Sequence, residues 1–275
     1  MVSRKALRIK GFASVVLMFA AVFALSACSA SDMVSKVEQI VSKDPYTLYT
    51  DANNKILAAK GVKETINING TMSLAGMKEP IKASTDVKMN DPYTSAMEMA
   101  MSLDMSVAGQ DLTATSYYKG GEIYTDAMGQ KSKTKVDMAK IRSQTALVQF
   151  KKNDIINQKR VKTSSGTDLT FTIKGAALKD YVTSSLGDLG SALGSSVQYD
   201  IKDATVVAHL AKDGNMTNCK VTMPFALTME GETVTANMTM EATNIEYGHQ
   251  DITPPSDLSS YQDASEASSS SSVAL

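Results

Sequence analysis

Two stretches decide the fold of this chain: residues 62–74, VKETININGTMSL, and residues 93–107, YTSAMEMAMSLDMSV. In the first stretch Val62, Ile66 and Ile68 fall on one side of an extended chain, and lysine, threonine and asparagine fall on the other. In the second stretch, Met97, Met99, Met101, Leu103 and Met105 occupy every other position. A period of two predicts β-strands with one buried face and one wet face. We therefore expect an antiparallel sheet.

The same alternation recurs along most of the chain. Further strands are expected at residues 81–89, 114–118, 123–128, 169–173, 204–211, 217–229 and 233–247. Asp213-Gly214-Asn215 and Glu230-Gly231-Glu232 separate the last three of these strands, and short glycine-containing segments of this kind predict hairpin turns. The sequence thus indicates long antiparallel strands joined by short connections.

Helical spacing occurs in three places. Asp44-Pro45 predicts an N-cap followed by proline at the first helical position, and Gly61 follows the expected helix. Its apolar face contains Leu48, Ala52, Ile56 and Ala59. Two further helices are expected at about 137–150 and 176–193. Together these patterns predict an α+β fold, a strongly curved antiparallel sheet forming an open half-barrel with helices packed in its concavity.

The N-terminus has the features of a secretory signal. Four basic residues between positions 4 and 10 precede an apolar run, residues 11–24, which is too short to span a bilayer as a permanent helix. The run leads to Leu25-Ser26-Ala27-Cys28, which is similar to the bacterial lipobox, where the cysteine thiol accepts a diacylglycerol. We expect a lipid anchor, with palmitate-type acyl chains, at Cys28. An ordinary signal peptide with a chance cysteine is the alternative.

These signals divide the chain into four segments. Residues 1–27 are expected to be a lipoprotein signal peptide and residues 28–43 a lipidated tether. Residues 44–255 are expected to form a single domain. Residues 256–275 are rich in serine, and so polar a segment predicts a disordered tail.

Composition excludes several classes of protein. With 21% charged residues and a net charge of −1, the chain has no basic excess for nucleic-acid binding, and 43% hydrophobic residues are too few for a polytopic membrane protein. Two cysteines and two histidines cannot supply the usual four-ligand metal site or a disulfide framework. We expect no cofactor, no metal and no nucleic-acid partner.

The motifs together resemble a known type of protein. The chain resembles an uncharacterised family of Gram-positive lipoproteins. The features that carry this resemblance are the lipobox, the short tether, the Asp44-Pro45 helix, the run from Tyr117 to Tyr124 and the closing Ile252-Thr253-Pro254-Pro255. That family is in turn similar to the LppX/LprG and LolA type of lipid carrier. The resemblance covers most of residues 44–255. It implies an open half-barrel that holds acyl chains, anchored at the outer face of the cytoplasmic membrane of a Gram-positive type envelope.

Methionine is the candidate binding residue. The chain has 17 methionines, many on the expected inward faces of strands, and a flexible, polarizable side chain adapts to irregular apolar ligands. A packed core in which methionine replaces leucine is the alternative. The expected apolar lining consists of Met89, Met97, Met99, Met101, Leu103, Met105, Met223, Phe225, Leu227, Met238 and Met240.

Residues 131–162 form a basic segment in an otherwise acidic protein. It holds ten lysines and arginines against two aspartates. Such a face could contact anionic lipid headgroups or cell-wall polymers, and a solvated face balanced by acids elsewhere is the alternative. The residues expected to make this contact are Lys151, Lys152, Lys159 and Arg160.

Residues with catalytic chemistry are few. His209 is expected on the solvent face of a strand and His249 just beyond the last strand, and neither belongs to a nucleophile or zinc motif. Cys219 alternates with Val221 and Met223, which favours a small core residue over a reactive thiol. We therefore expect no enzyme. The expected function is an anchored extracytoplasmic lipoprotein that binds or carries a lipid or another amphiphile. The alternatives are a non-enzymatic interaction module of the envelope and, third, a hydrolase whose groups meet through folding. No protein partner can be named.

Overall fold

The computed structural model describes residues 43–74, 77–92, 94–107, 109–136, 150–179, 198–229 and 232–263. The signal segment and Cys28 lie outside the described residues, as does the helix expected before Phe150. Of the helix expected from Ala176, the turn at residues 175–179 is helical and the remainder lies outside these ranges. Within them, no helix is both long and apolar enough to cross a membrane.

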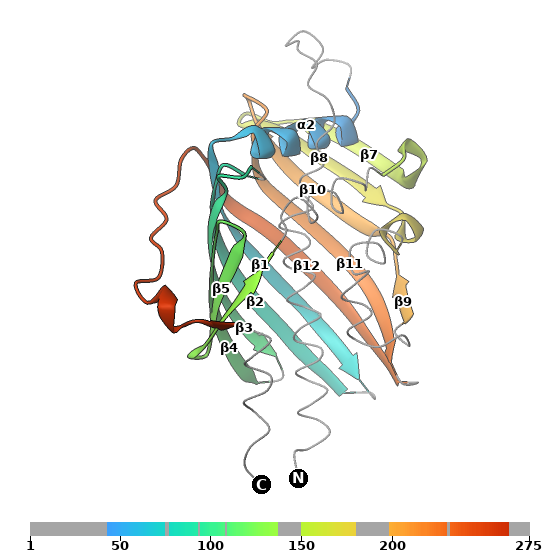
Figure 1. Cartoon of the computed structure of the whole chain (residues 1–275). Helices are drawn as coiled ribbons and strands as arrows, with labels where there is room; N and C mark the ends of the chain where they lie inside the picture. The colour runs from blue at the N-terminus through green and yellow to red at the C-terminus, as the bar shows by residue number, and fades with distance from the viewer. Residues whose placement is uncertain are drawn as a thin grey trace.

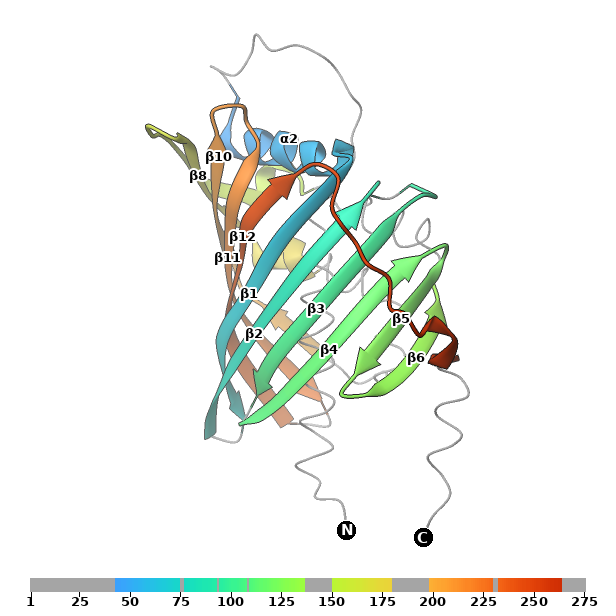
Figure 2. The ribbon, with the colours of Figure 1, turned by 90° about the vertical axis from the view of Figure 1, so that its left-hand side faces the viewer.

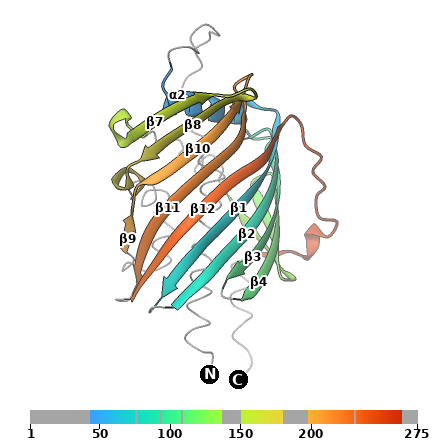
Figure 3. The same cartoon turned by 180° about the vertical axis from the view of Figure 1, so that it is seen from behind.

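The described strands form one large, curved and unclosed sheet, as Figure 1 shows from its concave side and Figure 3 from its convex side. Its order is β13-β6-β5-β4-β3-β2-β1-β12-β11-β10-β8-β7, and β9 also pairs with β11. All pairs are antiparallel except β13 with β6. The strands are β1 Gly61–Leu74, β2 Met77–Asn90, β3 Glu98–Val107, β4 Gln110–Lys119, β5 Glu122–Ala127, β6 Gln130–Lys135, β7 Ile155–Lys162, β8 Gly166–Ile173, β9 Gln198–Ile201, β10 Ala204–Ala211, β11 Met216–Met229, β12 Glu232–Tyr247 and β13 Gln262–Asp263.

Two meanders meet along a central seam. Strands β1 to β6 follow one another across one half of the sheet, and β7 to β12 make up the other half. The seam between them is the antiparallel pairing of β1 with β12, which runs from Val62 opposite Tyr247 to Leu74 opposite Val234. The first and last long strands of the chain therefore lie side by side in the middle of the sheet.

Alternation places the apolar side chains on the concave face, as the sequence predicts. Ile66, Ile68 and Met72 of β1 are at most 5% exposed, whereas Asn69 and Thr71 between them are exposed. The buried apolar residues form two clusters. The central cluster is built around residues such as Ile68, Ile81, Leu103, Met105, Phe171, Met223, Phe225 and Met238. The helix-end cluster contains Leu48, Ala52, Ile56, Val62, Met89, Met97, Tyr118, Leu169, Ala208, Leu210, Met216 and Ile245.

The single long described helix, α2 Pro45–Ala58, covers one end of the concave face (Figures 1 and 2). Asp44 caps it as predicted, because its Oδ1 accepts a hydrogen bond from the Thr47 backbone N–H at 3.0 Å. Leu48, Ala52 and Ile56 face the sheet and are at most 8% exposed. Ala59, which the sequence places on the same apolar face, lies just after the last helical residue, Ala58.

The sequence mispredicts several strands. β3 begins at Glu98, so Met97 does not belong to a strand; it is 1% exposed in the preceding turn. The strands β6, β7, β9 and β13 were not expected. β6 and β7 are rich in lysine, and a strand whose two faces are both largely polar has no apolar alternation to reveal it.

The described chain continues past residue 255, where the sequence places the end of the domain. The chain after β12 crosses the convex side of the sheet and ends in the 3-10 helix η3 Leu258–Ser260 and in β13 (Figure 2). We call residues 248–263 the C-terminal strap. Its Tyr261 is 7% exposed and packs edge-on against Tyr124, with ring centroids 5.6 Å apart. Asp257 forms an ion pair with Lys131. These contacts order a segment that its composition alone places in the tail; residues 264–275 lie outside the described ranges.

Candidate functional site

The concave face gathers the predicted apolar lining. Most of the predicted residues are at most 5% exposed, and they come from β2, β3, β11, β12 and the turn before β3. This fully buried group is Met89, Met97, Leu103, Met105, Met223, Phe225, Met238 and Met240. Leu227 is in β11, but its side chain lies outside the described set. The structure thus brings the predicted lining onto one face, and its binding role remains a prediction.

Part of the concave face retains contact with solvent. Met99 and Met101 of β3, together with Leu112 and Ala114 of β4, are only partly buried although they pack against the central cluster. Register places Met101 opposite Val87 of β2, so its side chain shares the concave face. An apolar face that is not completely covered is one on which an apolar ligand can still bury surface.

Glu64 is the anomaly of this face. It lies directly opposite the buried Val87 of β2 and between Val62 and Ile66 of its own strand, so it points to the concave side. A bulge in the β1–β12 pairing, at the point where Asn244 has a φ of 53°, leaves Glu64 opposite two residues of β12. Burial raises the pKa of the Glu64 carboxyl to about 7.

Neutral polar side chains surround this carboxyl. Glu64 interacts electrostatically with the Cys219 thiol of β11 and with the Tyr247 hydroxyl of β12, and the Tyr49 hydroxyl of α2 in turn interacts with Cys219 and Asn53. Burial raises the pKa of both Cys219 and Tyr247 to about 12, so neither group is charged at neutral pH. No ion pair or hydrogen bond to the Glu64 carboxylate is made within the described part of the chain.

Buried oxygens without partners lie at the same end of the sheet. Among the described residues, Asn53 Oδ1, Asn54 Oδ1 and Thr85 Oγ1 are buried and accept or donate no hydrogen bond. Thr85 is opposite Ile66 of β1, one register step along the concave face from Glu64. Such oxygens are uncommon because each costs roughly 1–3 kcal/mol when left unpaired. We call Glu64, Thr85, Asn53, Tyr49 and Cys219 the polar end of the concave face.

The polar end was not expected from the sequence, although polar residues at inward strand positions indicate it. Glu64 occupies an inward position in the alternation of residues 62–74, and Thr85 occupies one between Ala83 and Val87. A charged or hydroxyl side chain in an apolar register marks a break in the pattern. Cys219 is on the concave face as predicted, and its raised pKa agrees with an unreactive thiol.

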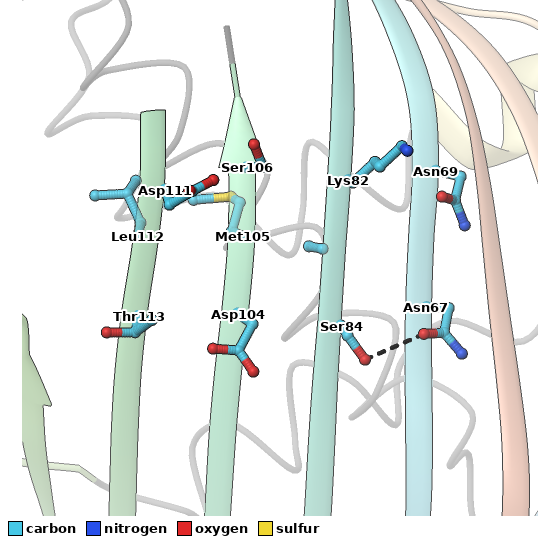
Figure 4. Close-up of a pocket in the computed structure, with 11 residues that line it drawn as sticks. Asn67, Asn69, Lys82, Ser84, Asp104, Met105, Ser106, Asp111, Leu112 and Thr113 are labelled. Atoms are coloured by element: carbon cyan, nitrogen blue, oxygen red, sulfur yellow. Dashed lines mark hydrogen bonds between the residues drawn. The ribbon is translucent and has the colours of Figure 1, made fainter. Parts of the chain in front are cut away.

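The convex face carries a separate groove of about 390 Å³ over β1 to β4 (Figure 4). Two cross-strand rows of polar residues line it, and the Ser84 hydroxyl donates a hydrogen bond to Asn67 Oδ1 at 3.1 Å. Its residues are Asn67, Asn69, Lys82, Ala83, Ser84, Asp104, Met105, Ser106, Asp111, Leu112 and Thr113. This open groove lies on the convex face, so it is not the apolar space that the sequence predicts on the opposite face.

The basic segment is divided between the two edges of the sheet. On β6, Lys131 is paired with Asp257 and lies 5.7 Å from the centre of the Tyr261 ring, so its charge is already compensated. At the other edge, Lys151, Lys152 and Lys159 are exposed, at or near the 3-10 helix η2 Lys152–Asp154 and β7. Arg160 is less exposed, because it lies opposite the fully buried Leu169.

Folding also brings a serine, a histidine and an aspartate together in the order of a catalytic triad. The Ser165 Oγ lies 3.2 Å from His209 Nε2, and Asp168 Oδ1 lies 2.6 Å from His209 Nδ1. The pairing of β8 with β10 sets Asp168 opposite His209, a juxtaposition that no local motif encodes. Ser165 is exposed in the β7–β8 turn, where bulk water would solvate any oxyanion, so the arrangement lacks the dry setting that strengthens acyl-transfer catalysis. Within the described ranges, no three His, Cys, Asp or Glu side chains gather as metal ligands.

Comparisons with known proteins give a fold likeness. No protein-family model matches the chain, and no curated protein matches it. Among solved structures, LprF from Mycobacterium bovis is similar at 12% identity and a TM-score of 0.37, over 77% of this chain and 96% of that one. A putative outer membrane lipoprotein-sorting protein domain from Vibrio parahaemolyticus is similar at 7% identity and a TM-score of 0.19, over 71% of this chain and 88% of that one.

With TM-scores of 0.37 and 0.19, these likenesses carry no argument about function, which has to be inferred from the residues of this chain itself.

Proposed function

We propose that this protein is a membrane-anchored extracytoplasmic lipoprotein that binds or carries a lipid or another amphiphile on its Met-rich concave face. Acylation at Cys28 would hold it at the outer face of the cytoplasmic membrane, and the domain would act without enzymatic chemistry. The sequence motif at residues 25–28 supports the anchor.

The observation that carries this proposal is the incomplete cover of Met99, Met101, Leu112 and Ala114 beside the buried residues of the same apolar face. A soluble domain gains stability by burying such side chains, and a bound acyl chain would bury them further. Methionine suits this role because its unbranched side chain can repack around chains of different shape. The sheet is open at both edges of its described part, so the curved wall can adjust to a ligand.

Native mass spectrometry of the mature chain carrying Cys28→Ala tests this proposal, because the variant lacks its own acyl chains. We expect a fraction of the protein to retain an apolar ligand that is released by organic solvent. Met101→Glu should abolish retention, since it places a charge on the apolar wall. The matched control is Ser102→Glu, on the same strand but exposed on the convex face. Repeated recovery of stable, ligand-free protein would refute the proposal.

A second candidate is an interaction module that contacts anionic envelope polymers. The exposed Lys151, Lys152 and Lys159 favour it, because they cluster at the β7 edge while Lys131 is paired elsewhere. Replacing these three lysines by glutamate should weaken binding to anionic vesicles or wall polymer by at least tenfold. Unchanged binding would show that the cluster is only a solvated face.

A further inference from the structure

We propose that the polar end of the concave face binds the headgroup of the ligand, and that this headgroup is a primary ammonium. The inference rests on the proposed binding function and adds the chemical class of the ligand. Glu64 would form the ion pair, and Thr85 Oγ1 and Asn53 Oδ1 would accept the remaining N–H donors.

The position of Glu64 carries the first step. Its register partner Val87 is 3% exposed, and both Val62 and Ile66 on either side are at most 5% exposed. Glu64 itself is half-buried, so its carboxylate loses part of its hydration, and a cation or hydrogen-bond donors can replace that part. The described part of the chain supplies neither, since burial alone accounts for the raised pKa of Glu64. A bound cation would supply the partner that the described residues do not provide.

The chemistry of the neighbouring groups selects an ammonium. Among the described residues, the unsatisfied groups at this end are oxygens that can accept a hydrogen bond: the Glu64 carboxylate, Thr85 Oγ1 and the Oδ1 atoms of Asn53 and Asn54. An ammonium offers three donors and no acceptor, so it matches this set. A phosphate or carboxylate headgroup would bring a second negative charge against Glu64.

The arrangement also fits an amphiphile. The polar end lies under α2, where Tyr49 and Cys219 pack against both apolar clusters. Met101 lies in the same cross-strand row as Glu64, since both are paired with Val87 of β2. Met105, Met238 and Met223 line the concave face further along the strands. A headgroup held at Glu64 would therefore direct its alkyl chain along the apolar wall.

Displacement of the neutral fluorescent probe N-phenyl-1-naphthylamine by dodecylamine and by dodecanol tests this inference. For the unaltered domain we expect dodecylamine to bind at least tenfold more tightly than dodecanol at pH 8. Glu64→Gln should weaken dodecylamine about 10- to 100-fold and leave dodecanol within about threefold. The matched control is Glu79→Gln, a glutamate opposite Met72 on the same face, about 27 Å away along the strands. It should change neither.

The pH dependence gives an independent readout. Tyr49, Cys219 and Tyr247, the titratable groups that face Glu64 from α2, β11 and β12, all have raised pKa values and stay neutral at pH 6–8. Of these described groups, Glu64 is the one that ionises in that range, so dodecylamine affinity should rise up to about tenfold from pH 6 to pH 8, and Glu64→Gln should remove the rise.

The outcomes separate the two proposals. Failure of the unaltered domain to bind the probe, dodecylamine and dodecanol alike would overturn the proposed function. Binding of all three, with the same affinities in Glu64→Gln as in the unaltered domain, would overturn only the headgroup assignment. An equal loss of dodecylamine and dodecanol in Glu64→Gln would also overturn it, because it would indicate a general defect in the concave face.

Discussion

Replacing Glu64 by glutamine should stabilise the ligand-free fold at alkaline pH. Burial raises the pKa of this carboxyl from 4.5 to about 7, so folding disfavours its ionised form. A carboxyl with a raised folded pKa leaves stability unaffected below the unfolded value and costs stability as the pH rises from about 4.5 to 7. At about 1.4 kcal/mol for each pH unit, the cost reaches about 3 kcal/mol at pH 8 and is about 1 kcal/mol at pH 5.

Urea denaturation of the unaltered domain and of Glu64→Gln, at pH 5 and pH 8, measures this cost. We expect the free energy of unfolding of the variant, relative to the unaltered domain, to be about 2 kcal/mol higher at pH 8 than at pH 5. Any penalty of burying the amide itself is the same at both pH values and cancels. Glu79→Gln should show no such difference. An equal effect of Glu64→Gln at the two pH values would refute the placement of an uncompensated carboxyl in the apolar wall.

Three further predictions concern other parts of the molecule. Asp44→Ala removes the cap that accepts from the Thr47 N–H and should lower the free energy of unfolding by about 1 kcal/mol, measured in urea, with no loss if the cap is unimportant. Tyr261→Ala removes the ring packed on Tyr124 and should make the C-terminal strap the first site of limited proteolysis; unchanged cleavage would contradict its role. Ser165→Ala should leave p-nitrophenyl acetate hydrolysis unchanged, and a tenfold fall would reveal an enzyme.

Local patterns predict the parts of this fold that local physics controls. Asp44 and Pro45 fix the start of α2 because capping involves only the first turn, and strict alternation fixes the concave face of β1 and β2. The same alternation predicts that the lining methionines share a face. It cannot predict whether Met99 and Met101 are completely covered, because that depends on what packs across the concavity.

Contacts between distant segments account for what the sequence did not reveal. The C-terminal strap is ordered by Tyr261 and Asp257, whose partners Tyr124 and Lys131 are more than a hundred residues earlier in the chain. The Ser165–His209 contact depends on the pairing of β8 with β10. Composition and periodicity contain no record of such pairings. Glu64 is different, because the alternation already places it on the inward face. That no described residue forms an ion pair or hydrogen bond with its carboxylate can be seen only in the structure.

The seam between β1 and β12 has a consequence for biogenesis. Thr243 and Thr65, which are hydrogen bonded across it, are 178 residues apart. The ribosome must therefore finish nearly the whole domain before β1 can acquire its second neighbour, and non-local pairing of this kind slows folding. Until then a 14-residue strand edge stays open to other chains. We expect a nascent chain to depend on a holding chaperone during that interval.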